Sequence, residues 1–341
     1  MQEPKTQKPI IEVYEDNFIK EIKRISTYIK KYPYIGMDTE FPGTVFPLEN
    51  YTKNFYYKFI KLNVDKLNLI QLGITLFNEK GEMSPEGSCW QFNFKFDLNN
   101  EKFSNQSISI LSNSGIDFLN LKNKGIPYNL FAEYFIISGL VLNDNIHWIS
   151  FNGFSDFAYL LKLCLNDNLP ENEDDFISYL DLYFPNYYDI KILSNLIDNL
   201  KGGLNKMAIQ LNIERFGDMH QAGSDSIVTG EVFFKIKDLN LISNNDILDL
   251  KNILFGIGKG SDDDETYQYT IFLSDIINVN NINNAKNNGF NNVYYGNFYN
   301  NINNNNINNI NVNNNEIFQF IQKKGSFDMN HYKNYPWNMF V

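Results

Sequence analysis

Apolar and polar residues alternate with two different periods in the first part of the chain. Over residues 18–29 the apolar side chains recur every three or four positions with charged residues between them, which predicts an amphipathic helix. The next apolar run, residues 34–37, leads into two carboxylates and stops at Pro42-Gly43. Such a run before a chain breaker is typical of a buried strand, here over residues 34–40.

The rest of the chain up to residue 261 follows a pattern of strands and helices. Aromatic and polar residues alternate over residues 90–96, which predicts a strand with one buried face, joined by a polar turn to a strand over residues 69–77. The other expected strands are 145–151 and 187–190, and the expected helices are 127–140, 155–164, 174–183, 192–200, 204–211 and a last long helix from about residue 223. An antiparallel start followed by alternating elements predicts an α/β fold, a single domain with a mixed sheet flanked by helices.

Two carboxylates stand two residues apart at the end of the strand over residues 34–40. Residues i and i+2 of a strand point to the same face, so Asp38 and Glu40 project together with their Cα atoms about 7 Å apart. Two anions this close repel each other unless a cation lies between them, and hard divalent ions prefer carboxylate oxygens. The pair predicts a metal site, although an isolated Asp-x-Glu pair is more often a solvated strand edge.

Three further residues extend this pair into a candidate catalytic site. Asp156 is expected near the N-terminus of a helix, and Asp225 in the first turn of the last helix, with His220 in the loop before it. Taken singly, either Asp is most often an acid that complements the helix dipole. Together, four carboxylates and an imidazole suit two-metal phosphodiester hydrolysis. Because Mg²⁺ prefers oxygen ligands, general base is the better role for His220, and a loop position lets it move toward the water.

Composition sets limits on this interpretation. A hydrophobic share of 43% suffices for a packed core, and a formal net charge of −11 argues against a generally basic nucleic-acid surface but not against a local basic groove. Cys89 and Cys164 are the only cysteines, so no disulfide framework is expected. The N-terminus lacks an apolar signal core and no stretch reaches membrane-spanning length. We expect a soluble, intracellular protein with no membrane partner.

The chain is expected to have three segments. Residues 1–10 form an N-terminal tail, residues 11–261 form the folded domain, and residues 262–341 form a C-terminal extension. Within the extension, 22 of the 38 residues from Asn278 to Asn315 are Asn. So biased a composition, with few charges and scattered Ile and Val, predicts a mostly disordered segment.

Four sequence blocks resemble one known family. They are MDTEFPG at residues 37–43, NLIQLGITL at 68–76, WQFNFKF at 90–96 and HQAGSDS at 220–226. In this order they resemble the Caf/Pop family of catalytic deadenylase subunits of the eukaryotic Ccr–Not complex. That family belongs to the exonuclease superfamily named for its Asp-Glu-Asp-Asp quartet, in the subgroup with a histidine. The resemblance covers residues 11–261.

The resemblance implies a ribonuclease H-like fold and a poly(A)-specific 3′-to-5′ exoribonuclease that shortens messenger RNA tails and releases 5′-AMP. It implies two divalent ions, Mg²⁺ or Mn²⁺, held by Asp38, Glu40, Asp156 and Asp225, with His220 as the base. The implied partners are the poly(A) tail, the scaffold subunit of the Ccr–Not complex and a second deadenylase subunit of the endonuclease-exonuclease-phosphatase type. All five positions hold the required residue type, which argues for an active enzyme.

One stretch departs from the family pattern. The family usually has an aromatic residue directly before the third acid, where this chain has Ser155, and Phe154 is the candidate replacement. Lys191, Lys201 and Arg215 are candidate phosphate contacts, with a solvated surface charge as the commoner interpretation of each. Two other functions stay open: a non-catalytic subunit that bridges the second deadenylase to the scaffold, and an exonuclease that acts on other RNA or DNA ends.

Overall fold

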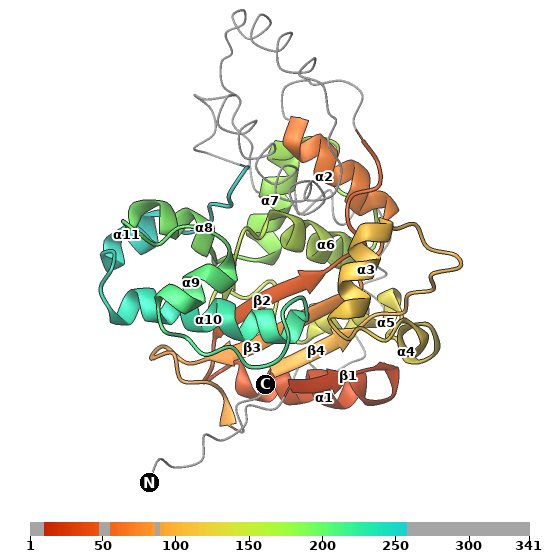
Figure 1. The fold of residues 1–341 in the computed structure, drawn as a ribbon, viewed down its shortest axis with the longest axis horizontal. Coiled ribbons are helices and arrows are strands. Elements are labelled where there is room, and N and C mark those ends of the chain that lie inside the picture. Colours follow the sequence, from red (N-terminus) through yellow and green to blue (C-terminus); the bar gives the residue numbers. More distant parts are fainter. Residues whose placement is uncertain (1–9, 48–54, 86–88, 258–341) are drawn as a thin grey trace, which may run out of the picture. The chain divides into compact units, whose positions relative to one another are not determined.

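Six strands form one mixed sheet in the computed structural model, which describes residues 10–47, 55–85 and 89–257 (Figure 1). Their order across the sheet is β1-β4-β3-β2-β5-β6. The strands are β1 (Ile10–Val13), β2 (Tyr34–Glu40), β3 (Gln71–Phe77), β4 (Cys89–Asn93), β5 (His147–Ser150) and β6 (Tyr187–Asp189). β3 is antiparallel to β2 and β4, whereas β1 is parallel to β4, and β5 is parallel to β2 and β6. The predicted mixed sheet is therefore confirmed.

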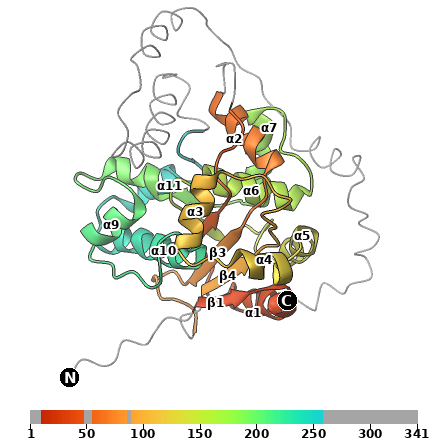
Figure 2. The ribbon, with the colours of Figure 1, turned by 45° about the vertical axis from the view of Figure 1, so that its right-hand side comes forward.

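Helices cover both faces of the sheet and enclose two separate hydrophobic cores. The core on one face includes side chains of α8 (Ile190–Leu193), α9 (Leu204–Gln210), α10 (Ala222–Asp238) and α11 (Asn244–Asp249). The core on the other face includes side chains of α1 (Glu15–Tyr28), α2 (Phe55–Lys66), α5 (Tyr128–Ile137), α6 (Phe154–Leu165) and α7 (Glu173–Tyr183). Two shorter helices, α3 (Asn105–Asn113) and α4 (Phe118–Lys124), share a third, smaller core. In both views α10 lies against the strands (Figures 1 and 2).

Two strand glycines let α10 lie directly on the sheet. A Cβ atom at Gly36 of β2 would overlap the backbone oxygen of Ser226, and one at Gly73 of β3 would overlap the backbone oxygen of Ala222. Because neither strand carries a side chain at these points, the first turns of α10 approach the strand backbones closely. The residues of β2 that share the face of Gly36, including Asp38, therefore point toward this helix.

The prediction that β4 has one solvated face is wrong. Gln91 and Asn93, the polar residues of its alternating pattern, are only 3% and 1% exposed. Gln91 is covered by the start of α10, where the backbone N–H of Gly223 donates to its Oε1 at 2.8 Å. Asn93 donates to Glu12 of β1 and accepts from Gln71 of β3. Alternation of apolar and polar residues thus marks a buried polar layer here rather than a wet surface.

Several elements of the structure are not predicted, because the hydrophobic patterns of their short segments are weak. They are β1, α2, α3, α4 and α11. The helix predicted over residues 192–200 is replaced by α8 and a 3₁₀ helix, η2 (Ser194–Leu196). Both cysteines are free thiols, and both are buried. Within the described part of the chain, no helix combines the length and apolar character needed to cross a membrane.

The predicted N-terminal tail and C-terminal extension lie mostly outside the described residues. The chain divides into two units, residues 1–272 and 273–341, and the second lies wholly outside the described residues. The C-terminal extension over residues 262–341 therefore remains a prediction. The N-terminal tail does as well for residues 1–9, whereas Ile10 already belongs to β1.

Candidate active site

The carboxyl end of β2 supplies two acids to one face of the sheet and a hydroxyl to the other. Asp38 and Glu40 are half-buried on the face covered by α10. Thr39 lies between them in sequence and so points to the opposite face, where it meets α6. The strand predicted from the apolar run has the same limits in the structure, residues 34–40, and places both acids as expected.

Asp156 lies in the first turn of α6, as predicted, and is held from two sides. The backbone N–H and the hydroxyl of Thr39 both donate to its Oδ1, at 3.1 and 2.5 Å. The turn before α6 is held by Asp189, a buried acid at the end of β6 that accepts hydrogen bonds from the backbone N–H groups of Asn152 at 2.8 Å and Gly153 at 3.2 Å. Two further backbone N–H groups, from later segments, donate to the same carboxylate. Asp156 is thus fixed before any ligand binds.

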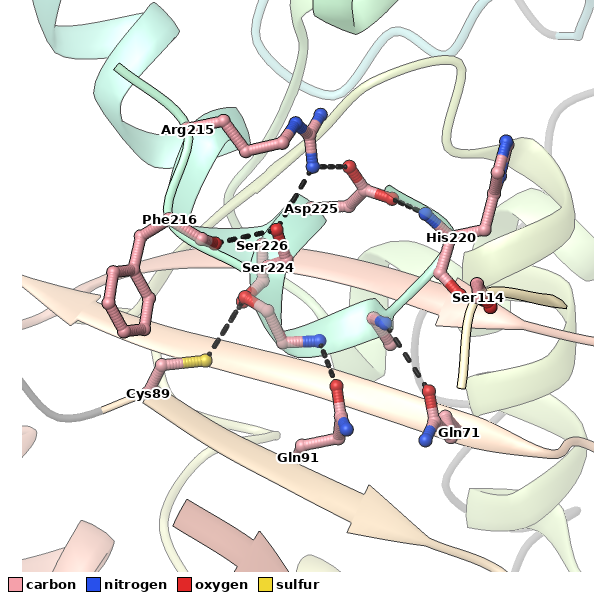
Figure 3. A network of polar contacts seen from close by, with 12 residues as sticks. Gln71, Cys89, Gln91, Ser114, Arg215, Phe216, His220, Ser224, Asp225 and Ser226 are labelled. Carbon is pink, nitrogen blue, oxygen red and sulfur yellow. Dashed lines mark hydrogen bonds and ion pairs between the residues drawn. The ribbon is translucent and has the colours of Figure 1, made fainter. Parts of the chain in front are cut away.

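Asp225 lies in the first turn of α10 between a cation and a backbone donor (Figure 3). Nη1 of Arg215 is 2.5 Å from its Oδ1, and the backbone N–H of His220 donates to its Oδ2 at 3.0 Å. Nη1 of Arg215 also lies 3.0 Å from the hydroxyl of Ser224. His220 is exposed, in the loop that enters α10, where the sequence places it. Both oxygens of Asp225 are therefore oriented by the protein.

The five predicted site residues converge at the end of β2. Ligand atoms of Glu40, His220 and Asp225 lie within 4.8 Å of one another. Burial, followed by repulsion from Asp225, Asp156 and Glu40, raises the pKa of Asp38 well above its usual range. Burial and repulsion from Asp225 and Asp156 do the same to the pKa of Glu40. Acids from three separate elements thus lie close enough to oppose one another's ionisation, an arrangement that divalent cations relieve.

The metal-free protein should lose stability as the pH rises from about 4 to about 7. Burial raises the pKa of Asp156 to about 7, against the opposing effect of the Thr39 hydrogen bond, whereas an unfolded Asp titrates near pH ~3.9. Below pH ~4 both states hold the proton and the contribution to stability is fully present. This contribution to stability is lost as the pH rises through the pKa of Asp156 in the folded protein, because the unfolded state releases this proton more readily.

Thermal denaturation in EDTA measures this effect. The Tm should be lower at about pH 8 than at about pH 5.5, and Asp156→Asn, which cannot ionise, should reduce the difference. A Tm difference that is identical in the wild type and the variant would contradict this placement of Asp156.

Two expectations about neighbouring residues are wrong. Phe154 does not present an aromatic surface beside Asp156, because it is 1% exposed and packs among Tyr56, Tyr57 and Phe176 in the core. Helix α6 begins at residue 154, and its first side chain turns inward onto α2 and α7. Arg215 is not a solvated surface charge: its side chain is 16% exposed and paired with Asp225.

The other candidate residues have simpler surroundings. Lys191 is half-buried, with its Nζ 5.9 and 5.6 Å from the ring centroids of Phe151 and Phe255. Lys201 is exposed, and whether either lysine contacts phosphate remains a prediction. His147 stacks on Tyr34 at a centroid distance of 4.5 Å, at the opposite end of β2 from the acids, which agrees with a structural role.

Sequence reasoning missed the residues that hold the acids in place. Thr39 lies between the two acids of β2, Asp189 ends β6, and Gln71 and Gln91 are amides within buried strands. The available signal was the polarity of Asp189, Gln71 and Gln91 in otherwise apolar strands, whereas Thr39 had none beyond its position between the acids. The contacts that link them to the elements carrying the acids span 36 to 151 residues of sequence, so no local pattern identifies them.

Comparison with known proteins assigns this chain to a family. The model of the CAF1 family ribonuclease matches residues 13–144 and 135–233, a span that includes the four acids and His220. The chain belongs to the CAF1 ribonuclease family. The resemblance inferred from the sequence blocks is thus confirmed, and the protein is a ribonuclease.

CAF1 family relatives match most of this chain and most of their own length. The chain is 42% identical over 258 residues to the probable CCR4-associated factor 1 homolog 7 of Arabidopsis thaliana, covering 73% of this chain and 93% of the relative. It is 40% identical over 253 residues to the poly(A) ribonuclease pop2 of Schizosaccharomyces pombe, covering 73% and 75%.

Solved CAF1 family structures match the fold. S. pombe Pop2p in its Mg²⁺ and Mn²⁺ bound form has a TM-score of 0.69 and 39% identity, covering 73% of this chain and all of that one. A structure of the yeast NOT1 MIF4G domain co-crystallized with CAF1 has a TM-score of 0.65 and 27% identity, covering 75% of this chain and 100% of that one. These matches confirm the predicted ribonuclease H-like α/β fold.

Proposed function

We propose that this CAF1 family ribonuclease shortens messenger RNA poly(A) tails from the 3′ end and releases 5′-AMP. The observation that carries the proposal is the convergence of Asp38, Glu40, Asp156 and Asp225 beside His220. The relative from S. pombe is named a poly(A) ribonuclease, and the matching Pop2p structure is a Mg²⁺ and Mn²⁺ bound form. Both support the same substrate and the same metals for this chain.

The donor set fits two divalent cations. Four ionised carboxylates balance the charge of two Mg²⁺ or Mn²⁺ ions and offer the oxygen atoms that these ions prefer. When bound, two ions activate a water and stabilise the leaving oxygen of an in-line displacement. The protein contributes preorganisation: Thr39 holds Asp156, and Arg215 with the backbone of His220 holds Asp225. We therefore assign the four acids as the metal-binding residues.

We assign His220 as the general base. A ring nitrogen lies within 4.8 Å of carboxylate oxygens of Glu40 and Asp225, so the imidazole is placed to accept a proton from a water bound among these acids. The exposure of the side chain lets it return that proton to solvent after each cycle. Oxygen-rich surroundings favour Mg²⁺ coordination by the acids and leave the imidazole free for this role.

The substrate assignment is tested with 5′-labelled oligonucleotides that differ in the base of the 3′ tail or in the sugar. Tails of A and of U, and a DNA oligomer ending in A, are incubated with the purified chain and Mg²⁺. We expect stepwise shortening of the A tail, with 5′-AMP as the product and much slower loss of the other two. Equal rates on all three would instead indicate an exonuclease without tail preference.

A second role is supported by one observation: the yeast structure in which the NOT1 MIF4G domain is co-crystallized with CAF1. We propose that this chain also binds the scaffold subunit of a Ccr–Not-type complex and links it to a second deadenylase subunit of the endonuclease-exonuclease-phosphatase type. Size-exclusion chromatography of the chain with each purified partner tests both contacts. A chain that binds both partners but leaves A tails intact would be a bridge without catalysis.

A further inference from the structure

Gln221, the residue after His220, forms hydrogen bonds with both the nitrogen and the oxygen of its side-chain amide. Nε2 of Gln221 donates to the backbone oxygen of Ser114, at the end of α3, at 2.8 Å. Its Oε1 accepts hydrogen bonds from Nε2 of Gln91 at 2.8 Å and from Nε2 of Gln71 at 3.3 Å. One side chain therefore joins three segments that lie far apart in the sequence.

The two sheet amides that hold Gln221 are themselves anchored. Gln71 and Gln91 are 2% and 3% exposed. Nε2 of Gln91 also donates to Oε1 of Glu12 at 2.9 Å, and Nε2 of Gln71 donates to Oδ1 of Asn93 at 2.8 Å. Buried amides with this many partners have little freedom to rotate. Figure 3 shows Gln71 and Gln91 beneath the start of α10, where Oε1 of Gln91 accepts from the first turn of the helix.

The main chain of His220 is constrained on both sides. Its φ of 62° lies in the left-handed region, which a residue with a side chain adopts only when its surroundings hold it there. Its N–H is bound to Asp225, and the next residue is held by its amide. The Ser114 hydroxyl lies 2.9 Å from the backbone oxygen of His220 and 2.8 Å from that of Leu111. It has a single proton to donate, which these two acceptors share. The Gln221 amide is therefore the firmer link.

We propose that Gln221 is a positioning residue that holds the His220 backbone so that the imidazole faces the acids. The proposal rests on the assigned role of His220 as general base. It replaces the expectation of a base that travels on a mobile loop: here the backbone is fixed, and the imidazole moves only by rotation of its own side chain. A base held in this way avoids the entropy cost of ordering the loop at each turnover.

Gln221→Met tests the proposal, because Met has a similar length but neither donates nor accepts these hydrogen bonds. We expect kcat on A-tailed RNA to fall about 10- to 100-fold, with KM for RNA and the Mg²⁺ concentration for half-maximal rate unchanged within about twofold. Gln221→Glu is the second variant, since it keeps the acceptor for Gln71 and Gln91, loses the donor to Ser114 and adds a negative charge. We expect the same selective loss of kcat. Gln210→Met, at an exposed amide of α9, is the matched control.

A double-mutant cycle with His220→Ala separates positioning from general loss of structure. In the His220→Ala background, Gln221→Met should cause no further loss, because the group it positions is absent. An equal loss in both backgrounds, or no loss with His220 present, would overturn the proposal. Failure of the assigned base role is distinguishable, since His220→Ala alone would then keep the wild-type rate.

Discussion

Asp38→Asn should abolish tail shortening and at the same time raise the Tm of the metal-free protein. The first effect follows because Asp38 is assigned as a metal ligand, and a neutral amide is a far weaker ligand for a hard cation. We expect a loss in kcat of at least about a thousand-fold, which corresponds to ~4 kcal/mol of transition-state stabilisation. The second effect follows because burial and three neighbouring acids raise the pKa of Asp38, so that the unfolded chain ionises it more readily than the folded, metal-free chain, and a neutral Asn removes this penalty.

The opposite signs of the two effects make this variant informative. A rate assay in Mg²⁺ and a thermal denaturation in EDTA measure them on the same preparation. Asp174→Asn, at an exposed acid in the first turn of α7, is the control and should change neither. A lower Tm for Asp38→Asn in EDTA would mean that the loss of activity reflects damage to the fold.

His220→Ala should slow the reaction by about 10² to 10⁴ in kcat while metal binding is mostly retained, as expected on loss of a positioned general base. The acids keep their arrangement in this variant, because the contact of His220 with Asp225 is made by its backbone N–H. The measurement is kcat across a Mg²⁺ titration. The Mg²⁺ concentration for half-maximal rate should stay within about threefold of the wild type if His220 acts as a base rather than a ligand.

The alternative role for His220 gives a different result. If the imidazole is a metal ligand, its removal weakens binding of the ion, and a high concentration of Mn²⁺ restores much of the rate. Recovery of near-wild-type kcat at saturating Mn²⁺ would therefore replace the base assignment with a ligand assignment.

Local signals predicted the parts of the site that depend on neighbouring residues. The apolar run and chain breaker around β2 fixed its limits, and the alternation of strand side chains then placed Asp38 and Glu40 on one face. Helix-start signals placed Asp156 and Asp225 in first turns, where the structure also has them. These predictions succeed because strand and helix geometry determines direction over a few residues.

The contacts that hold the site depend on distant parts of the chain. Gln91 is buried because α10, 130 residues later, covers β4, and a pattern within one strand cannot show this. Phe154 was the candidate replacement for the aromatic residue expected at position 155, but it lies one position earlier and turns into the core. An error of one residue changes the direction of a helical side chain by about 100°. Contacts between residues far apart in the sequence therefore determine which of these side chains are buried, and a local pattern cannot show them.

Shortening of 5′-labelled A-tailed RNA, measured with Mg²⁺ and with excess EDTA, tests the central claim that the acids at the end of β2 form a metal-dependent ribonuclease site. We expect 3′-to-5′ shortening in Mg²⁺, none in EDTA, recovery when Mg²⁺ or Mn²⁺ is restored in excess, and none by Asp225→Asn under any of these conditions. Shortening that persists in EDTA, or proceeds at the wild-type rate in Asp225→Asn, would contradict this claim.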